Sequence, residues 1–564
     1  MKKPGAHAIL TAILTPSLLV FVGIPMAVLL AKSLVDGPAV YLDAIRVPSN
    51  RNALVNTLIS GLGAAAVSLA VGAPLGAALA RLNIAGKRIL GTLLVLPLAA
   101  PPYVLAMAWI ALASPRAGWI NKLAVSWGLS SDGNPLVDIY GMPGIIWVLG
   151  LSLYPFVLLP TRAALESADP SLEEAARIGG AGPIRSFVTG SLPVAAPAIA
   201  AGTLTAFLGA ISAFGVPYLL GVATDRPVLV ATTRIYQAMS LGAEADVRSS
   251  IAMCVLLLVL AFAATFAAER AASARSLSTK GRRPRALEAP GLTRLASIGA
   301  WVFTFVAVAL PMGATVLAAL TKRFADPPGP GNLTLDQFTT VLGKADTRTA
   351  LFNSALLATV SATLIVVLGL AVAFLRRRGR GSPRVAAALS RVCELPYAIP
   401  GSVLALALLL SFSQEIRFVF ANYVTISVSF LGTLWLLLVA YVVKYLAFGV
   451  RSADNAIVAV DPTLEEAARI SGAGPGRAFM DVSLPLARPA LMAAWILAFL
   501  PAATELTMSV LLAGPRSQVL GTLLFELSSY ADPPSAAVLG CIALALVVAA
   551  DVLLRRLTEK PETT

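Results

Sequence analysis

Twelve runs of mostly apolar residues, each about 20 residues or longer, constrain the fold of this chain more than any other feature. A helix of about 20 apolar residues is long enough to cross the hydrocarbon core of a bilayer. Of the 564 residues, 57% are hydrophobic and 13% are charged, whereas soluble domains carry roughly 25% charged residues. The sequence therefore predicts an all-α, polytopic membrane protein with about twelve transmembrane helices.

The apolar runs form two sets of six, separated by a basic segment rich in helix breakers. The first set is expected near residues 9–32, 53–80, 89–113, 143–163, 191–222 and 249–268. The second set is expected near residues 295–320, 351–375, 386–412, 421–449, 484–513 and 535–554. This pattern predicts two six-helix units, 1–268 and 295–564, joined by a polar linker at 269–294.

The two sets are repeats of each other. The segment DPSLEEAARIGGAGPIRSFVTGSLP, which begins at Asp169, recurs as DPTLEEAARISGAGPGRAFMDVSLP from Asp461. Three further pairs of similar segments follow in the same order in each half, beginning at Asn56 and Asn353, Leu96 and Leu395, and Phe207 and Phe499. Because six spans is an even number, both copies have the same orientation, which indicates a parallel repeat about an axis normal to the membrane.

Positive charge is distributed unevenly among the loops. If the N-terminus is cytoplasmic and the spans alternate, Lys and Arg are about twice as frequent in the segments that face the cytoplasm. This bias predicts cytoplasmic N- and C-termini, and it places the linker and both polar repeats on the cytoplasmic side. The net charge of +14 is then a membrane-protein property, so lipid and not nucleic acid is the expected surrounding partner. The first apolar run is too long for a signal peptide and is interpreted as an uncleaved span.

Several classes of chemistry are excluded by composition. His7 is the only histidine, so catalysis by histidine and histidine-based metal clusters are not expected. Cys254, Cys393 and Cys541 lie far apart and form no CxxC, so neither a disulfide framework nor a zinc site is indicated. No GxxxxGK[ST] phosphate-binding loop is present. We expect a chain that is not an enzyme and has no cofactor and no metal site.

The repeated polar segment predicts a short, capped helix. Asp169 with Pro170 is a favourable N-cap and first turn, and the acidic residues that follow suit the positive end of the helix dipole. The sequence GGAGP then ends the helix after two or three turns. Isolated helices below about 12 residues rarely persist in water, so this one needs a surface to lie on. That surface is either the protein's own cytoplasmic end or a partner protein.

Both copies contain Glu-Ala-Ala, then three residues and Gly, then about ten residues and Leu-Pro. This pattern resembles the signature loop of ABC-importer permeases. The resemblance implies a type I permease fold, in which each short helix docks on a separate cytoplasmic ATPase and couples it to the membrane domain. The residues so assigned are Glu173, Glu174, Ala175, Ala176, Gly180, Leu192 and Pro193 in loop 1, and Glu465, Glu466, Ala467, Ala468, Gly472, Leu484 and Pro485 in loop 2. One departure is Gly190, where the family usually has an aliphatic residue such as Val482, and a looser joint is expected there.

The segments PPYVLA from Pro101, LYPFVLLPTRAAL from Leu153 and ELTMSVLL from Glu505 look like those of fused ferric-iron permeases. Fused thiamine permeases share this layout, and 2-aminoethylphosphonate permeases are relatives. The resemblance implies a permease in the bacterial inner membrane, with ferric iron as substrate and thiamine or 2-aminoethylphosphonate as alternatives. It also implies two copies of an ATP-binding subunit and a periplasmic substrate-binding protein as partners. A secondary transporter is the alternative from another class, although it would not need two capped cytoplasmic loops.

Ionisable side chains within apolar spans are costly and often functional. Glu505 lies in the eleventh expected span, opposite Ala213 of the first half, and Glu394 lies in the ninth. Two interpretations remain open for Glu505: it lines the substrate pathway, or it hydrogen-bonds a neighbouring helix for packing. With Tyr103 of the third span, these two carboxylates are the candidate pathway residues. Lys444 in the tenth span is a weaker candidate of the same kind.

Prolines recur at matched places in the third and ninth expected spans. They are Pro97, Pro101, Pro102, Pro396 and Pro400. Proline interrupts the helical hydrogen-bond ladder, which is tolerable at membrane depth only where protein or a water-filled cavity covers the break. These positions predict helix kinks that serve either packing or gating.

Overall fold

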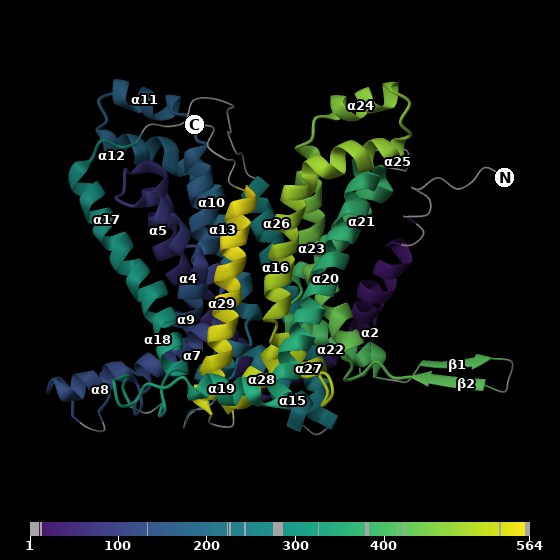
Figure 1. Ribbon diagram of the computed structural model, residues 1–564, viewed down its shortest axis with the longest axis horizontal. Helices are drawn as coiled ribbons and strands as arrows, with labels where there is room; N and C mark the ends of the chain where they lie inside the picture. The colour runs from purple at the N-terminus through teal and green to yellow at the C-terminus, as the bar shows by residue number, and fades with distance from the viewer. Residues whose placement is uncertain are drawn as a thin grey trace. The chain divides into compact units, whose positions relative to one another are not determined.

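In the residues that it describes, the computed structural model consists mainly of helices, with one two-stranded sheet (Figure 1). It describes every residue except 1–10, 12, 13, 36, 132, 133, 223, 225, 226, 242, 243, 274–285, 325, 378–382, 414, 415, 421–423, 530, 531 and 559–564. The helical membrane fold expected from the apolar runs is confirmed. Residues 274–285 of the predicted linker 269–294 lie outside the described residues.

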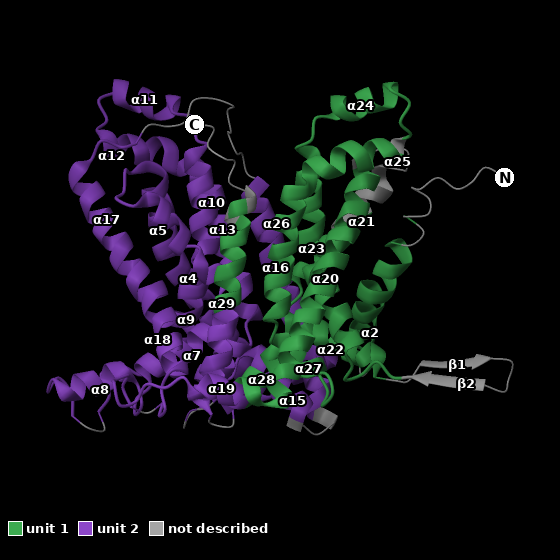
Figure 2. Cartoon of the chain, in the orientation of Figure 1, with its two compact units in different colours: residues 1–38, 342–526, 545–564 green, residues 39–341, 527–544 purple. Residues whose placement is uncertain are grey.

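The chain packs as two compact units (Figure 2). Unit 1 comprises residues Met1–Pro38, Leu342–Glu526 and Ala545–Thr564, and unit 2 comprises Ala39–Val341 and Leu527–Leu544. Each unit is built on the core of one sequence half but takes up the first membrane helix of the other half. In unit 1, α2 (Ile24–Ser33) packs against α22 (Gly401–Phe412). In unit 2, α18 (Leu310–Ala319) packs against α7 (Pro102–Ala113).

The remaining helices of unit 2 follow the order of the chain. They are α3 (Ala39–Arg46), α4 (Pro48–Arg81), α5 (Lys87–Leu93), α6 (Leu96–Ala99), α8 (Trp119–Ser126), α9 (Met142–Leu153), α10 (Pro155–Glu166), α11 (Ser171–Ile178), α12 (Pro183–Ser186), η2 (Phe187–Ser191), α13 (Leu192–Ser212), α14 (Gly215–Pro217), η3 (Tyr218–Val222), α15 (Ala231–Leu241), α16 (Glu244–Ser273), α17 (Pro290–Thr304) and η4 (Phe305–Ala309).

Unit 1 repeats this order from α20 onwards. Its other elements are η1 (Leu19–Gly23), α20 (Ala345–Arg377), α21 (Pro383–Ala398), β1 (Ile416–Phe420), β2 (Val424–Val428), α23 (Leu434–Val458), α24 (Pro462–Ile470), α25 (Pro475–Ala478), η5 (Phe479–Ser483), α26 (Leu484–Ala503) and α27 (Thr507–Leu512). Three helices cross the boundaries between the two units: α19 (Asp336–Gly343), α28 (Leu520–Ser529) and α29 (Pro533–Thr558).

Among the described residues, ten helices are long and apolar enough to cross a bilayer, or twelve spans if each of two bent pairs counts as one. The ten are Leu14–Ser33, Pro48–Arg81, Met142–Glu166, Pro183–Ser212, Asp246–Ser273, Pro290–Ala319, Ala345–Arg376, Leu434–Val458, Gly476–Ala503 and Pro533–Leu554. The bent pairs are Lys87–Ala99 with Pro102–Ala113, and Val392–Ala398 with Gly401–Phe412. All twelve correspond in order to the expected spans.

The expected spans 89–113 and 386–412 are not continuous helices. They bend by 101° and 115° at the matched prolines. Ala100 precedes Pro101 and is extended, because a proline disfavours helical geometry in the residue before it. Carbonyls near the breaks accept hydrogen bonds from side chains of neighbouring helices. The Tyr154 hydroxyl donates to the Leu94 carbonyl at 2.7 Å, and the Lys444 ammonium donates to the carbonyls of Ile399 and Tyr397.

Three other expected spans end early or begin late. The predicted helix 421–449 begins only at Leu434, because residues before it form β1 and β2, an antiparallel pair in which Ile416 lies opposite Val428. This segment is rich in β-branched and aromatic residues, which favour strands. The spans 191–222 and 484–513 also break, since α13 ends at Ser212 and α26 ends at Ala503.

Small residues set the closest helix contacts in unit 2. At Gly72 of α4, an added Cβ would lie 2.6 Å from the Tyr154 carbonyl oxygen, and at Gly76 it would lie 2.6 Å from that of Leu158. The backbones of α4 and α10 therefore meet directly, as the Gly-x-x-x-Gly spacing indicates. In unit 1, Gly369 of α20 approaches Gly449 of α23 in the same way.

We expect Gly76→Ala to lower the thermal unfolding midpoint of the detergent-purified protein by several degrees, because overpacking of this kind costs roughly 1–3 kcal/mol. Gly299→Ala on α17 is the matched control, since a Cβ there meets no atom within 4 Å. Equal unfolding midpoints for the two variants would contradict the close contact between α4 and α10.

Candidate functional site

The two copies of the polar repeat form two short helices, α11 in unit 2 and α24 in unit 1. The Asp169 carboxylate accepts a hydrogen bond from the Ser171 backbone N–H at 2.9 Å, and Asp461 accepts one from Thr463 at the same distance. These bonds satisfy donors that a helix N-terminus leaves open. Within unit 2, α11 lies beyond the end of α10, and α8 lies at the opposite end of that unit (Figure 1).

Both helices end in the same way. Gly180 has a φ of 84° and Gly472 a φ of 94°, a left-handed conformation that a residue with a Cβ rarely adopts. In α11 the Gly180 N–H donates to the Arg177 carbonyl and the Ala181 N–H donates to the Ala176 carbonyl. Gly472 and Ala473 make the equivalent bonds at the end of α24. The glycines predicted from the loop signature are thus required by the helix stop itself.

Each helix has one buried carboxylate and one exposed apolar edge. Glu173 and Glu465 are 4% and 9% exposed, whereas their neighbours Glu174 and Glu466 are exposed. Ile178 is 89% exposed and its counterpart Ile470 is 88% exposed, and Leu172 and Leu464 are exposed as well. Ala175 and Ala467 are exposed, and Ala176 and Ala468 are half-buried.

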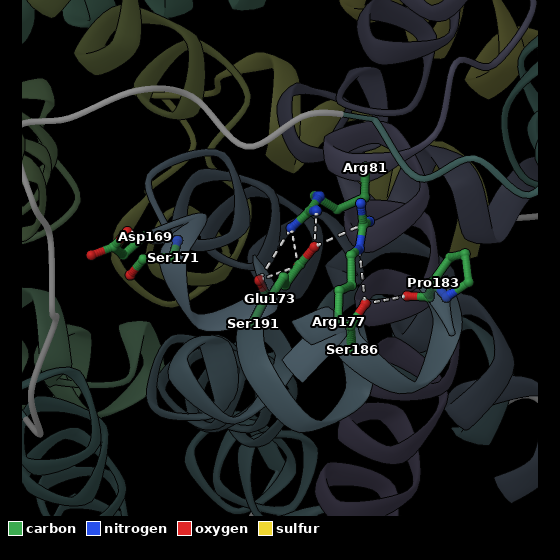
Figure 3. A network of polar contacts seen from close by, with 8 residues as sticks. All are labelled: Arg81, Asp169, Ser171, Glu173, Arg177, Pro183, Ser186 and Ser191. Atoms are coloured by element: carbon green, nitrogen blue, oxygen red, sulfur yellow. Dashed lines mark hydrogen bonds and ion pairs between the residues drawn. The ribbon is translucent and has the colours of Figure 1, made fainter. Parts of the chain in front are cut away.

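Glu173 belongs to an anchor cluster with Arg81 and Ser191 (Figure 3). Arg81, the last residue of α4, donates from Nη1 to Oε1 of Glu173 at 2.6 Å and from Nη2 to Oε2 at 2.7 Å. Ser191 donates its hydroxyl to Glu173 Oε1 and accepts a bond from Arg81 Nη1 at 3.2 Å. Such a two-bond fork fixes the orientation of both side chains as well as their distance. The anchor cluster therefore joins the end of α4, the first turn of α11 and the start of α13.

The electrostatics of the anchor cluster favour the ionised carboxylate. Burial acts to raise the pKa of Glu173, but hydrogen bonds from Arg81 and Ser191, together with the charges of Arg81 and Arg177, outweigh it and hold the pKa below its ordinary value. A depressed pKa means that the ion pair is intact at neutral pH and is lost only as the pH falls through that lowered value. The Arg81 guanidinium also lies 5.6 Å from the centre of the Phe187 ring.

Unit 1 has the equivalent contact in its own loop, where the Ser483 hydroxyl donates a hydrogen bond to the Glu465 carboxylate. Ser483 occupies the position that Ser191 holds in unit 2, directly before the Leu-Pro of the loop signature. Arg378 corresponds to Arg81 in the repeat and lies outside the described residues. The buried glutamate and its serine are therefore features of both loops.

The remaining signature residues begin the next membrane helix in each unit. Leu192 and Pro193 open α13 after η2, and Leu484 and Pro485 open α26 after η5. The looser joint expected at Gly190 is not found. An added Cβ at Gly190 would lie 3.3 Å from the Glu173 backbone nitrogen and from its Cγ, so the glycine lets η2 pack directly against α11.

Each unit has a hydrophobic core to which the η element beside its short helix contributes, through Phe187 of η2 and Phe479 of η5. In unit 2 it joins α4, α5, α10 and α17 through a buried set that includes Leu79, Leu90, Tyr154, Leu158 and Ala300. In unit 1 the equivalent core includes Ala373, Ala453, Ile457, Phe479 and Leu491 from α20, α23, η5 and α26. Because α11 contacts η2 and α24 contacts η5, each short helix is connected to the core of its own unit.

The candidate pathway residues lie in different settings. Glu505 falls in the break between α26 and α27 and accepts a hydrogen bond at 2.8 Å from the backbone N–H of Met508, in the first turn of α27. Its charge interacts with that of Lys444. Glu394 on α21 pairs with Arg451 at 3.0 Å, and Tyr103 on α7 of unit 2 is buried. Their part in a substrate pathway stays a prediction.

Metal ligands do not gather in the described part of the chain. Within the described residues no group of three or more His, Cys, Asp or Glu side chains is arranged to hold a metal ion. Cys254 and Cys393 are buried free thiols in separate units.

Arg81 is the residue that sequence reasoning missed. It lies at the cytoplasmic end expected for the second span, where a positive charge is unremarkable under the positive-inside rule. The pair Glu173-Glu174 could have indicated a buried partner for one carboxylate. Adjacent residues of a helix point about 100° apart, so the two glutamates cannot both face the same partner.

Comparison with known proteins gives relatives along most of the chain. Ferric transport system permease protein FbpB of Actinobacillus pleuropneumoniae is 26% identical over 436 residues, which cover 75% of this chain and 59% of that protein. Fe(3+)-transport system permease protein FbpB 2 of Haemophilus influenzae is 22% identical over 530 residues, covering 91% of this chain and 92% of that protein. A solved bacterial ABC transporter involved in the import of the acidic polysaccharide alginate matches with a TM-score of 0.39 and 18% identity, over 48% of this chain and 96% of that chain.

A family pattern matches the chain twice, at residues 72–276 and 365–562, which together are more than half of its length. Each match contains one short helix, its buried glutamate and the Leu-Pro that follows it. The chain therefore belongs to the family of binding-protein-dependent transport system inner membrane components and carries the family's domain in two copies.

Proposed function

We propose that this chain is a membrane-spanning permease of an ABC importer and that α11 and α24 are docking surfaces for ATPase subunits. The observation that carries the proposal is the exposed edge of each helix. Ile178 and Ile470 are large apolar side chains, almost fully exposed, on otherwise polar loops. Exposed apolar side chains rimmed by polar residues are typical of protein interaction sites.

The charge and location of the two helices suit the binding of a cytoplasmic partner protein. Glu174 and Glu466 lie next to the apolar edge and supply negative charge for a basic partner. The positive-inside bias supports a cytoplasmic location for both helices and for both chain termini. ATP hydrolysis then belongs to a separate subunit, and a periplasmic binding protein delivers substrate from the other face of the bacterial inner membrane.

Ferric iron is the substrate that we propose, with thiamine and 2-aminoethylphosphonate as alternatives. The relatives named for ferric or Fe(3+) transport support this choice, since one of them matches over 91% of the chain. A secondary transporter is the competing class, and it would use an ion gradient in place of ATP.

A combined variant with Ile178→Asp and Ile470→Asp should reduce copurification of the ATPase subunit by about tenfold or more, because each change puts a charge into an apolar contact. The measurement is a pull-down of the full-length chain from detergent-solubilised membranes. Leu335→Asp is the control, because Leu335 is 70% exposed but lies in another loop. Unchanged ATPase recovery in the combined variant would rule out the docking role.

Two docking helices on one chain should bind two ATPase subunits. Native mass spectrometry of the purified complex should therefore give a ratio of two ATPase copies to one permease chain. A single ATPase copy per chain would contradict the equivalence of α11 and α24.

Uptake driven by ATP should be blocked by vanadate, which traps ABC ATPases, and should persist when ionophores collapse the ion gradients. We expect labelled ferric iron to accumulate in cells that produce the transporter. Thiamine and 2-aminoethylphosphonate should compete with it weakly or not at all. Uptake that follows the ion gradient and ignores vanadate would instead identify a secondary transporter.

A further inference from the structure

Two adjacent glutamates of α11 face opposite surroundings. Glu174 is exposed beside the apolar edge proposed to meet the ATPase. Glu173 points into unit 2 and forms the anchor cluster with Arg81 and Ser191, with side-chain exposures of 6% for Glu173 and 2% for Arg81. The loop signature treats these two carboxylates as one feature, but the geometry separates them.

The anchor cluster ties α11 to a rigid block. Its arginine ends α4, a helix of 34 residues. The backbones of α4 and α10 meet at Gly72 and Gly76, so the two helices are in direct contact along this length. The chain passes from α10 to α11 through only a few residues, which gives α11 a covalent link to the same block. The first turn of α11 is therefore held to the α4–α10 pair both by the chain and by the buried ion pair.

The other end of α11 leads into a glycine-rich segment, and the side chain of Arg177 there donates a 3.4 Å hydrogen bond to Ser186 of α12. Gly179, Gly180 and Gly182 follow the helix, and a Cβ at Gly180 or Gly182 would meet no atom within 4 Å. Glycines lower the resistance of the backbone to changes in φ and ψ. A force applied to α11 would be absorbed in this segment if nothing fixed the first turn of the helix.

We infer that Glu173 is a positioning residue, which acts through Arg81 to pass a displacement of α11 on to membrane helix α4. This inference rests on the proposed coupling role of α11. The two-bond fork resists both translation and rotation of the helix. Because both charges are buried, neither can leave its partner without a large desolvation cost, so the contact holds while α11 moves. Ser191 extends the same connection to the start of α13.

The test measures coupling separately from binding. The full chain, its ATPase subunit and its binding protein are reconstituted in lipid vesicles, and substrate uptake and ATP hydrolysis are measured on the same sample. Glu173→Gln keeps the size of the side chain and removes its charge. We expect ATPase copurification to stay within about twofold of wild type, while substrate transported per ATP falls about tenfold.

Glu174→Gln is the matched control one residue away. It should weaken ATPase binding and leave the substrate transported per ATP by the remaining complexes unchanged. The exchange of charges, Glu173→Arg with Arg81→Glu, should restore much of the coupling that each single change removes. Arg81→Lys keeps the charge but loses the fork, and it should lower coupling by a smaller factor than Glu173→Gln.

Three results would overturn the inference. Unchanged transport per ATP in Glu173→Gln would show that the ion pair transmits nothing. Lost ATPase binding in the same variant would place Glu173 in the docking surface and leave the proposed function standing. Parallel loss of transport and hydrolysis in Arg81→Lys and Glu173→Gln, with no recovery in the charge exchange, would assign the pair a purely structural role. Full ATPase binding by the combined Ile178 and Ile470 variant would instead count against the proposed function.

Discussion

A bilayer core offers no water to backbone N–H and C=O groups, and this constraint governs how the chain is allowed to depart from straight helices. The third and ninth spans bend by 101° and 115°, so each bend exposes carbonyls that need a donor. Unit 2 meets that need with the Tyr154 hydroxyl at Leu94, and unit 1 meets it with the Lys444 ammonium at Ile399. The two units therefore share the bend but use different side chains to satisfy its carbonyls. A neutral donor occupies one unit and a cation the other, and the cation is accompanied by Glu505, which has only Ala213 as its counterpart.

Much of the fold could be predicted because it depends on local composition. Apolar runs of sufficient length identify the spans, and Asp169, Asp461, Gly180 and Gly472 mark the ends of the two short helices through capping rules that need no tertiary information. The sharpness of the bends could not be predicted, since a proline signals a break but not its angle. The strands β1 and β2 were also missed, because a short apolar segment next to a span reads as part of that span.

The candidate site likewise has a part that local sequence predicts and a part that depends on tertiary contacts. Residue types and spacing predicted two loop helices with glycine stops, and both are present. The direction in which Glu173 points depends on Arg81, which lies 92 residues away in the sequence, so no local pattern contains it. Gly190 illustrates the same limit: it looked like a weakened joint, yet the missing side chain is what allows η2 to approach α11. A residue that lacks contacts of its own can thus make a contact between others possible.

The exchange of first helices between the two units has a consequence for biosynthesis. Helix α2 packs against α22, which is made roughly 370 residues later. At about 5–20 residues per second, α2 waits roughly 20–70 seconds in the membrane before its partner exists. During that time it must be stable as a lone helix surrounded by lipid. The mostly apolar sequence of Leu14–Ser33, whose 18-residue window has a mean hydropathy of 2.2 and is only 22% buried in the finished protein, is suited to contact with lipid during that time.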